Sequence, residues 1–317
     1  MYALTLLLPP RSRFDGQSLP AGLGKALGRG DRLPDGQGGW RAQLQRHIGV
    51  LPRGWPVAAV TRQLDAGDAA LNAWLRADPA HVRADIGTGR MLACGDLDLS
   101  LEEAQDFLRP LMPLFGDAGY PISAPVPDRW YLMLPREARL PPFAEPEDVL
   151  GDDLCDHLPA GDGGRRWRAL LNEAQVILHN HPRNAGRVAA GKLPVNSLWF
   201  WGGGVLPDHV ELAATAVFTR EAQLAGFARL AGVRAAALPA AFAALADVAG
   251  DVAGEVLVDL RGQRDLAALE RDWLAPAQRA LGKAVSELVL DFADGAAWRL
   301  TGGQRWRIWR RPATLAG

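Results

Sequence analysis

The chain has 317 residues, of which 48% are hydrophobic and 22% are charged, so it has the composition of a globular protein with one large core or two ordinary ones. Its formal net charge of −1 excludes a strong overall attraction to nucleic acid or to an acidic membrane surface. Cys94 and Cys155 are too few for a disulfide framework, and we expect both to be reduced.

The first residues are apolar and predict a β-strand. The run from Tyr2 to Leu8 lacks the basic start and the small-residue cleavage site of a signal peptide. No apolar run in the sequence reaches the length of a membrane span. We therefore expect a cytoplasmic protein with no membrane partner.

Residues 9–39 are rich in Gly, Pro, Arg and Asp, and they include the glycine-rich segment 22–30. This segment invites comparison with a phosphate-binding loop. However, Lys25 is followed by Ala26 instead of the Ser or Thr of a P-loop, and the spacing does not fit a dinucleotide-binding fingerprint. We expect a mobile loop here.

Clearer signals follow in the first half of the chain. A pair of strands is predicted at residues 81–86 and 90–94, around a Gly-Thr-Gly turn. Residues 100–103 read Ser-Leu-Glu-Glu, a capping box that should begin a helix ending near Pro110. Another strand is predicted at residues 129–134.

The periodic pattern ends between residues 136 and 165. Prolines alternate there with an acidic run at residues 145–156, a composition typical of a linker. We therefore predict an N-terminal α+β domain at residues 1–135, a linker at 136–165, and an α/β domain at 166–317.

The predicted second domain begins with a helix at residues 166–179, after which strands and helices alternate. Strands are expected at 198–201, 213–218 and 256–260, and helices at 220–230, 235–249 and 265–281 with an interruption at Pro276. The fold class that this pattern indicates is α/β, with a mixed sheet and flanking helices.

The chain should end in an antiparallel meander. Its two turns are predicted at Asp294-Gly295 and Gly302-Gly303. In its last strand Trp306 and Ile308 would share one face, with arginines on the other. Arginines mixed with aromatic residues also occur on nucleic-acid surfaces. The alternation favours a half-buried edge strand, and we expect no nucleic-acid partner.

The densest group of polar donors and glycines lies at residues 179–204. An arginine offers a planar fork that matches phosphate or carboxylate oxygens. Glycines let backbone amides approach an anion. We therefore predict a site for a small phosphorylated or carboxylated ligand, formed by His181, Asn184, Arg187, Asn196, Trp199, Trp201, Gly202, Gly203 and Gly204.

Each of these residues also has a structural alternative. His181 can fix the exit of a helix, the asparagines can cap backbone groups, the indoles can cover the core, and the glycines can form a tight strand exit. His179 and His181 lack a third ligand at metal-binding spacing. We expect no metal, no cofactor and no catalytic residue in this chain.

The motif His181-Pro-x-Asn-x-x-Arg, followed by Pro194-x-Asn-x-Leu-Trp-x-Trp-Gly-x-Gly, resembles archaeal-type, cofactor-independent phosphoglycerate mutases. It is more fully similar to a bacterial group described as RpfE-type regulatory proteins, which are relatives of those mutases. This second resemblance extends to residues 77–85, 129–132 and 165–168.

The resemblance implies a remnant of the alkaline-phosphatase-like α/β scaffold of the mutases. Those enzymes hold two metal ions on clustered Asp and His side chains and pass the phosphoryl group through a Ser or Thr. Here Pro9 and Pro10 follow the first strand, where the mutases begin their metal site with Asp-Gly. The strand 256–259 is followed by Leu-Arg-Gly, without an Asp-x-His pair. The scaffold is therefore expected without its metal centre.

We therefore predict a bacterial, cytoplasmic regulatory protein, a pseudoenzyme of mutase-like fold that binds a small anionic metabolite. Two alternatives stay open. The first is an active metal-dependent phosphoryl-transfer enzyme with a rearranged metal site. The second is a protein-interaction module whose tryptophan-rich segments contact a protein partner.

Overall fold

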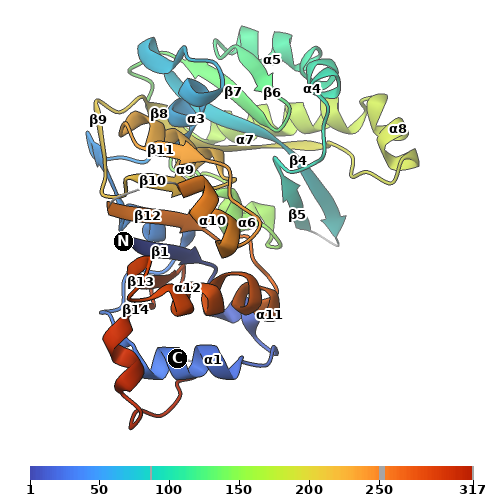
Figure 1. Ribbon diagram of the computed structural model, residues 1–317. Coiled ribbons are helices and arrows are strands. Elements are labelled where there is room, and N and C mark those ends of the chain that lie inside the picture. Colours follow the sequence, from blue (N-terminus) through green and yellow to red (C-terminus); the bar gives the residue numbers. More distant parts are fainter. Residues whose placement is uncertain (86–87, 250–253, 316–317) are drawn as a thin grey trace. The chain divides into compact units, whose positions relative to one another are not determined.

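The computed structural model describes residues 1–85, 88–249 and 254–315, and the chain divides into two compact units (Figure 1). Unit 1 comprises residues 1–51 and 209–317, and unit 2 comprises residues 52–208.

This division differs from the predicted one. The segment 136–165, predicted as a linker, lies inside unit 2, and residues 1–51 belong with the C-terminal half of the chain. The cause is strand pairing between distant parts of the sequence, which no local pattern reveals.

A mixed sheet forms the centre of unit 1. Its strands are β1 (Tyr2–Leu8), β2 (Asp31–Arg32), β10 (Ala216–Phe218), β11 (Arg234–Ala236), β12 (Gly254–Asp259), β13 (Val285–Phe292) and β14 (Ala297–Thr301). The order across the sheet is β11-β10-β12-β1-β13-β14-β2. The first five of these strands are parallel, and β14 and β2 add antiparallel pairs. The predicted α/β class with a mixed sheet is confirmed.

β1 lies between β12 and β13 (Figure 1). Leu4, Leu6, Leu7 and Leu8 are all fully buried, because a parallel strand covered on both faces needs apolar side chains on both. The helices that contribute to this core are α1 (Ala21–Arg29), α10 (Phe242–Ala249), α11 (Leu266–Leu269) and α12 (Ala275–Ala280). A π-helical turn, Glu270–Leu274, joins α11 to α12 and places Pro276 in the first turn of α12, where its missing N–H is tolerated.

The glycine-rich segment 22–30 is not a loop. It forms most of α1, so the loop prediction is wrong here. A Cβ atom at Gly28 would collide with the carbonyl oxygen of Arg311, and one at Gly24 would lie 3.2 Å from that of Ala313. The glycines therefore let the C-terminal segment pack closely across the helix.

The C-terminal meander is confirmed in part. β13 and β14 form the predicted hairpin, with Gly295 at φ 93° in its turn. The predicted third strand is wrong, because residues Gly302–Trp306 form a short 3-10 helix, η5, and β2 takes the place beside β14. Trp306 and Ile308 are 68% and 76% exposed instead of half-buried.

Unit 2 contains an antiparallel sheet covered by helices. Its strands are β4 (Ala73–Asp85), β5 (Thr88–Cys94), β6 (Ile122–Val126), β7 (Arg129–Leu134) and β8 (Ser197–Val205). Its main helices are α3 (Val57–Asp65), α4 (Leu101–Leu108), α5 (Leu111–Asp117), α7 (Gly161–His179) and α8 (Arg183–Ala189). The order is β5-β4-β7-β6, with β8 also paired to β4. The predicted capping box begins α4, and its two hydrogen bonds are both present.

Two further expectations concern cysteines and membranes. Cys94 and Cys155 are both free, as predicted. Across the part of the chain that the structure describes, no helix is both long and apolar enough to cross a bilayer.

A buried ion pair lies on β4. Arg76 and Asp78 are 5% and 1% exposed, and two hydrogen bonds of 2.8 Å join the guanidinium to the carboxylate. Asp78 also accepts from the backbone N–H of Trp130 at 3.3 Å and from the indole of Trp201 at 2.6 Å. The carboxylate is therefore surrounded by donors, which is what a charge at this depth requires.

We expect Asp78→Ala to lower the free energy of unfolding by about 3–5 kcal/mol, because the Arg76 charge would remain buried without its partner. Urea denaturation of the full chain measures this loss. The matched control is Arg165→Ala, which breaks an ion pair exposed at both ends and should leave the unfolding free energy nearly unchanged. Equal effects of the two substitutions would contradict the importance of the buried pair.

Candidate functional site

The residues predicted to bind a ligand lie in unit 2, from the end of α7 to the end of β8. His181 follows α7, and its Nε2 donates to the backbone oxygen of Asp106 at 3.1 Å. Its Nδ1 accepts from the backbone N–H of Arg183 at 3.3 Å. Burial lowers the pKa of His181, which agrees with a neutral ring that donates at one nitrogen and accepts at the other. His181 therefore ties the exit of α7 to α4.

The two predicted asparagines bond to backbone groups. The Asn184 amide donates to the carbonyls of Leu178 and Val195 at 2.8 and 2.9 Å, and its oxygen accepts from the Val195 N–H at 2.9 Å. Asn196 pairs in the same way with the N–H and the carbonyl of Val82, at 2.8 and 2.7 Å. Both carboxamides thus satisfy the backbone where the chain leaves α8 and enters β8.

Arg187 is 2% exposed and bonds within the protein through all three nitrogens. It donates to the Leu193 carbonyl at 2.9 Å, to the Glu103 carboxylate at 2.9 Å, and to the Leu97 carbonyl. Burial by itself would raise the pKa of Glu103, but hydrogen bonds from Ser100 and Arg187 outweigh it and the pKa is lowered. Arg187 therefore links α8 to the capping box of α4.

The indoles and glycines of the predicted site belong to β8. Trp199 donates to the Ala144 carbonyl at 2.9 Å, and Trp201 donates to Asp78. A Cβ atom at Gly202 would lie 2.9 Å from Val57, and one at Gly204 would lie 2.7 Å from Pro56. A Cβ atom at Gly203 would collide with Leu140. The glycines therefore let neighbouring segments approach the strand closely.

The structure places all nine predicted residues in unit 2 but does not gather them at one point. Asn196 bonds to Val82 near one end of β4, whereas Gly204 pairs with Trp74 near the other end. Each of the six side chains is bonded inside the protein. Asn196 also lines a groove of about 580 Å³ whose other walls include Leu171, Gln175 and Val176. The ligand-binding role of the nine residues stays a prediction.

Sequence reasoning missed a second constellation, in unit 1. Leu7 of β1 is in register with Asp259 on one side and with Asp291 on the other. Residues in register on neighbouring strands point to the same face of a sheet. The two aspartates therefore flank Leu7 at the carboxyl end of the parallel strands, which is where α/β proteins usually bind ligands.

Asp259 is 5% exposed and held by an arginine two residues later. The Arg261 guanidinium donates to both carboxylate oxygens at 2.8 and 2.9 Å, and the Thr219 hydroxyl adds a hydrogen bond of 2.9 Å. Burial by itself would raise the pKa of Asp259, but the charge and hydrogen bonds of Arg261 outweigh it and the pKa is lowered.

Asp291 is 2% exposed and receives donors from the chain after α2 (Trp40–Gln45). Arg46 Nη2 lies 2.5 Å from one carboxylate oxygen, and His47 Nε2 lies 2.7 Å from the other. Gln43 anchors α2 at the same place by donating to the backbone oxygens of Leu8 and Asp291.

This donor set does not fit a pair of metal ions. Asp259 and Asp291 each form an ion pair with an arginine. Leu7, which lies between them, has no atom that could bind a metal ion. Within residues 1–85, 88–249 and 254–315, no three His, Cys, Asp or Glu side chains gather as a cation site would require. The signal in the sequence was weak, because Arg46 and His47 belong to no motif and lie far along the chain from Asp291.

No protein-family model matches the chain. One segment is 44% identical over 62 residues to a probable 2,3-bisphosphoglycerate-independent phosphoglycerate mutase of Geobacter sulfurreducens, and another comparison gives 42% over 62 residues with the mutase of Methanosarcina acetivorans. Each match covers 20% of this chain and 16% of the relative. The similarity to the curated mutases is thus a similarity of one segment, and the finer resemblance to RpfE-type proteins stays a prediction.

Two solved structures align with most of the chain. A cofactor-independent phosphoglycerate mutase from Thermoplasma acidophilum DSM 1728 is 16% identical with a TM-score of 0.44, and the alignment covers 96% of this chain and 90% of the mutase. A protein from Pyrococcus horikoshii is 13% identical with a TM-score of 0.47, over 98% and 91% of the two chains.

We expect Arg187→Ala to lower the free energy of unfolding by about 2–3 kcal/mol, because Glu103 and two backbone carbonyls would lose their donor. Thermal or urea denaturation measures the loss. Lys192→Ala is the control, since its ion pair with Asp98 is exposed and should matter little. An Arg187→Ala protein as stable as the control would show that this network does not support unit 2.

The Asp259–Arg261 pair predicts a pH dependence. A carboxylate whose folded pKa is lowered adds stability above its unfolded pKa of about 3.9, and this stability is lost as the pH falls through the folded pKa. In Arg261→Ala, burial instead raises the folded pKa, so the carboxylate costs stability at neutral pH and acid relieves that cost. The stability difference between the natural protein and Arg261→Ala should therefore shrink from neutral to acidic pH.

The control for this prediction is the same comparison in an Asp259→Asn background. There the difference made by Arg261 should no longer vary with pH, because the titrating group is gone. A difference that still shrinks in the Asp259→Asn background would assign the pH effect to another group.

Proposed function

We propose that this chain is a regulatory protein of the RpfE type, related to the phosphoglycerate mutases, that binds a small phosphorylated or carboxylated metabolite and does not carry out metal-dependent phosphoryl transfer. The segment of 62 residues shared with named mutases supports the relationship. The cytoplasmic location predicted from the sequence belongs to this proposal.

The observation that carries the proposal is the pairing of Asp259 and Asp291 with arginines at the carboxyl end of the sheet. In phosphoryl transfer by two metal ions, the metal ions bind the attacking and leaving oxygens. The protein must therefore offer carboxylates and imidazoles that are free to bind both metal ions. A metal ion bound to Asp259 or Asp291 would have to displace Arg261 or Arg46 and would leave that guanidinium without its partner. The pairs therefore count against metal-dependent phosphoryl transfer at Asp259 and Asp291.

A second candidate function is a protein-interaction module, which the sequence had left open. It is favoured by three large apolar side chains at the end of η5 and just after it: Trp306, Ile308 and Trp309 are 68%, 76% and 74% exposed. Exposed aromatic groups of this kind are common at protein interfaces. The two functions are compatible, because a regulatory protein can bind a metabolite at one site and contact a protein partner through another surface.

The proposal predicts no stoichiometric metal and no mutase turnover. The purified full chain is incubated with Mn²⁺ and Zn²⁺, dialysed, and analysed by plasma mass spectrometry. Interconversion of 3- and 2-phosphoglycerate is then assayed beside the Methanosarcina acetivorans mutase as a positive control. We expect well under one bound metal ion per chain and no turnover above the blank.

Two bound metal ions per chain together with turnover would overturn the proposal. A variant with both Arg46→Ala and Arg261→Ala tests whether the two arginines exclude metal ions from Asp259 and Asp291. If the guanidiniums are what keep cations from the two aspartates, this variant should bind more Mn²⁺ than the natural protein while still lacking turnover.

A further inference from the structure

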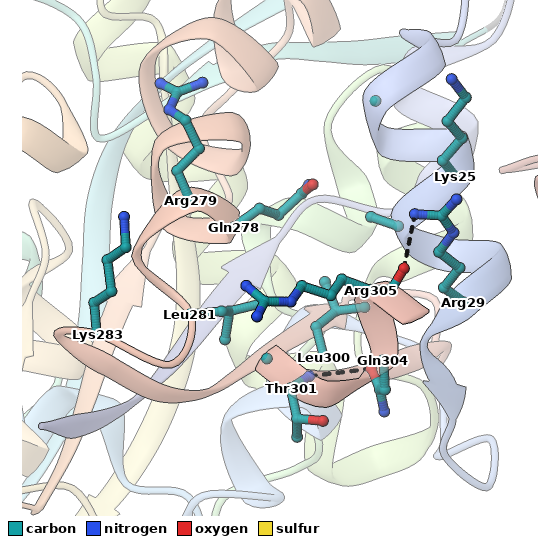
Figure 2. A pocket seen from close by; sticks show the side chains of 13 residues that line it. Lys25, Arg29, Gln278, Arg279, Leu281, Lys283, Leu300, Thr301, Gln304 and Arg305 are labelled. Atoms are coloured by element: carbon teal, nitrogen blue, oxygen red, sulfur yellow. Dashed lines mark hydrogen bonds between the residues drawn. The ribbon is translucent and has the colours of Figure 1, made fainter. Parts of the chain in front are cut away.

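A cavity of about 390 Å³ lies in unit 1, at the end of the sheet where β13 begins and β14 ends (Figure 2). Its walls come from three separate segments: α1, the end of α12 with the loop into β13, and η5 with the end of β14. The loop is held by hydrogen bonds from Gly282 N–H to the Val285 carbonyl and from Lys283 N–H to the Ala280 carbonyl. The volume is within the range of small-ligand sites.

The lining of this cavity is strongly basic. It includes Lys25, Arg29, Arg279, Lys283 and Arg305 and contains no Asp or Glu. Figure 2 shows Arg279 and Lys283 on one side and Lys25 and Arg29 on the other. Among the described residues, none of the five cations takes part in an ion pair. Lys25, Arg279, Lys283 and Arg305 are exposed, so water screens part of their repulsion, and Arg29 donates to the Arg305 carbonyl at 3.3 Å. Together the five cations still give the cavity a positive potential that attracts an anion.

Helix dipoles account for only part of this arrangement. Arg29 and Arg279 lie in the last turns of α1 and α12, where a cation offsets the partial negative charge of the carbonyls. Arg305 lies likewise in the last turn of the short helix η5, whereas Lys25 and Lys283 have no such role. Lys25 and Arg29 are four residues apart on α1, so both side chains reach the cavity from one face of the helix.

Two acidic residues, Asp31 and Glu270, lie close to residues that line the cavity. Asp31 accepts a hydrogen bond of 2.9 Å from Gln304 and pairs with Arg307. The Glu270 carboxylate lies close to Gly22, since a Cβ atom there would be 2.8 Å from Glu270 Oε1. Burial raises the pKa of Glu270 against the opposing effect of Arg279. Glu270 is partly buried and is not one of the residues that line the cavity.

Gln278 adds an uncharged polar side chain to the lining of the cavity. It lines the cavity between the two groups of cations (Figure 2), and its Nε2 is buried without a hydrogen-bond partner. An unpaired buried donor is costly. Half a turn of the amide exchanges its nitrogen and oxygen. The oxygen then takes the buried position, and the donor is available in the cavity to water or to an anionic oxygen.

We propose that this cavity binds a small anion carrying at least two phosphoryl groups. The cations come from opposite walls, so one charged group alone would leave one wall unpaired, whereas two linked groups reach both. Arginine and lysine are the residues that recognise phosphate. The assignment rests on the proposed function, since it gives the anionic metabolite a place in unit 1, outside the nine residues predicted from the sequence.

The test uses pyrophosphate and inorganic phosphate as probes, with the full chain at constant ionic strength. Calorimetric titration should show pyrophosphate binding more tightly than phosphate. The double variant Arg279→Gln with Lys283→Gln should weaken pyrophosphate binding at least about tenfold, because it removes the charged donors of one wall. Lys25→Gln, on the other wall, should weaken it less but clearly.

The matched control is Arg220→Gln, which removes an exposed cation of the same unit outside the cavity and should leave binding unchanged. Circular dichroism checks that each variant is folded. No pyrophosphate binding by the natural protein, or equal binding by the double variant and the control, overturns the assignment. A single-stranded oligonucleotide that binds more tightly and with the same losses also overturns it.

These outcomes are separable from those of the proposed function. If pyrophosphate binds equally well to the double variant and to the natural protein, the cavity is not its binding site. The proposal that the protein binds an anion would still stand. Stoichiometric metal binding together with mutase turnover would exclude the proposed function. Pyrophosphate binding that depends on Arg279 and Lys283 would even then show that the cavity binds pyrophosphate.

Discussion

The parallel pairing of β1 with both β12 and β13 is the constraint on which the functional interpretation depends. It places Asp259 and Asp291 on either side of Leu7, at the end of the sheet where α/β proteins most often bind ligands. Each carboxylate is buried, so each needs a compensating charge. Arg261 and Arg46 supply this charge. The guanidiniums that stabilise the two buried carboxylates are bonded to the same oxygens that a metal ion would need.

Local signals were sufficient for much of the fold. The apolar run of β1, the capping box of α4, the periodicity of α7 and the Asp294-Gly295 turn all depend on residues close together in the sequence. The glycines of α1 misled the sequence analysis, because they look like a loop and owe their presence to the C-terminal segment that packs on them. The place of β2 beside β14 and the division into units depend on long-range pairing in the same way.

The candidate sites show a similar limit. Residues 181–204 hold many donors, as the sequence shows, but the groups that these donors contact, such as Val82, Leu97 and Asp106, lie far away in the chain. Whether a polar residue meets a ligand or a backbone carbonyl depends on those distant groups. No single sequence motif predicts the basic cavity. Lys25 and Arg29 belong to the glycine-rich segment 22–30, which does not fit a phosphate-binding loop, and the other cations come from two distant segments.

Anomalous diffraction at the manganese edge, from crystals of the chain grown with Mn²⁺, would show whether cations reach Asp259 and Asp291. We expect no anomalous peak between the two carboxylates, with Arg261 and Arg46 still bonded to them. Two manganese peaks coordinated by these carboxylates, with the guanidiniums displaced, would contradict this expectation.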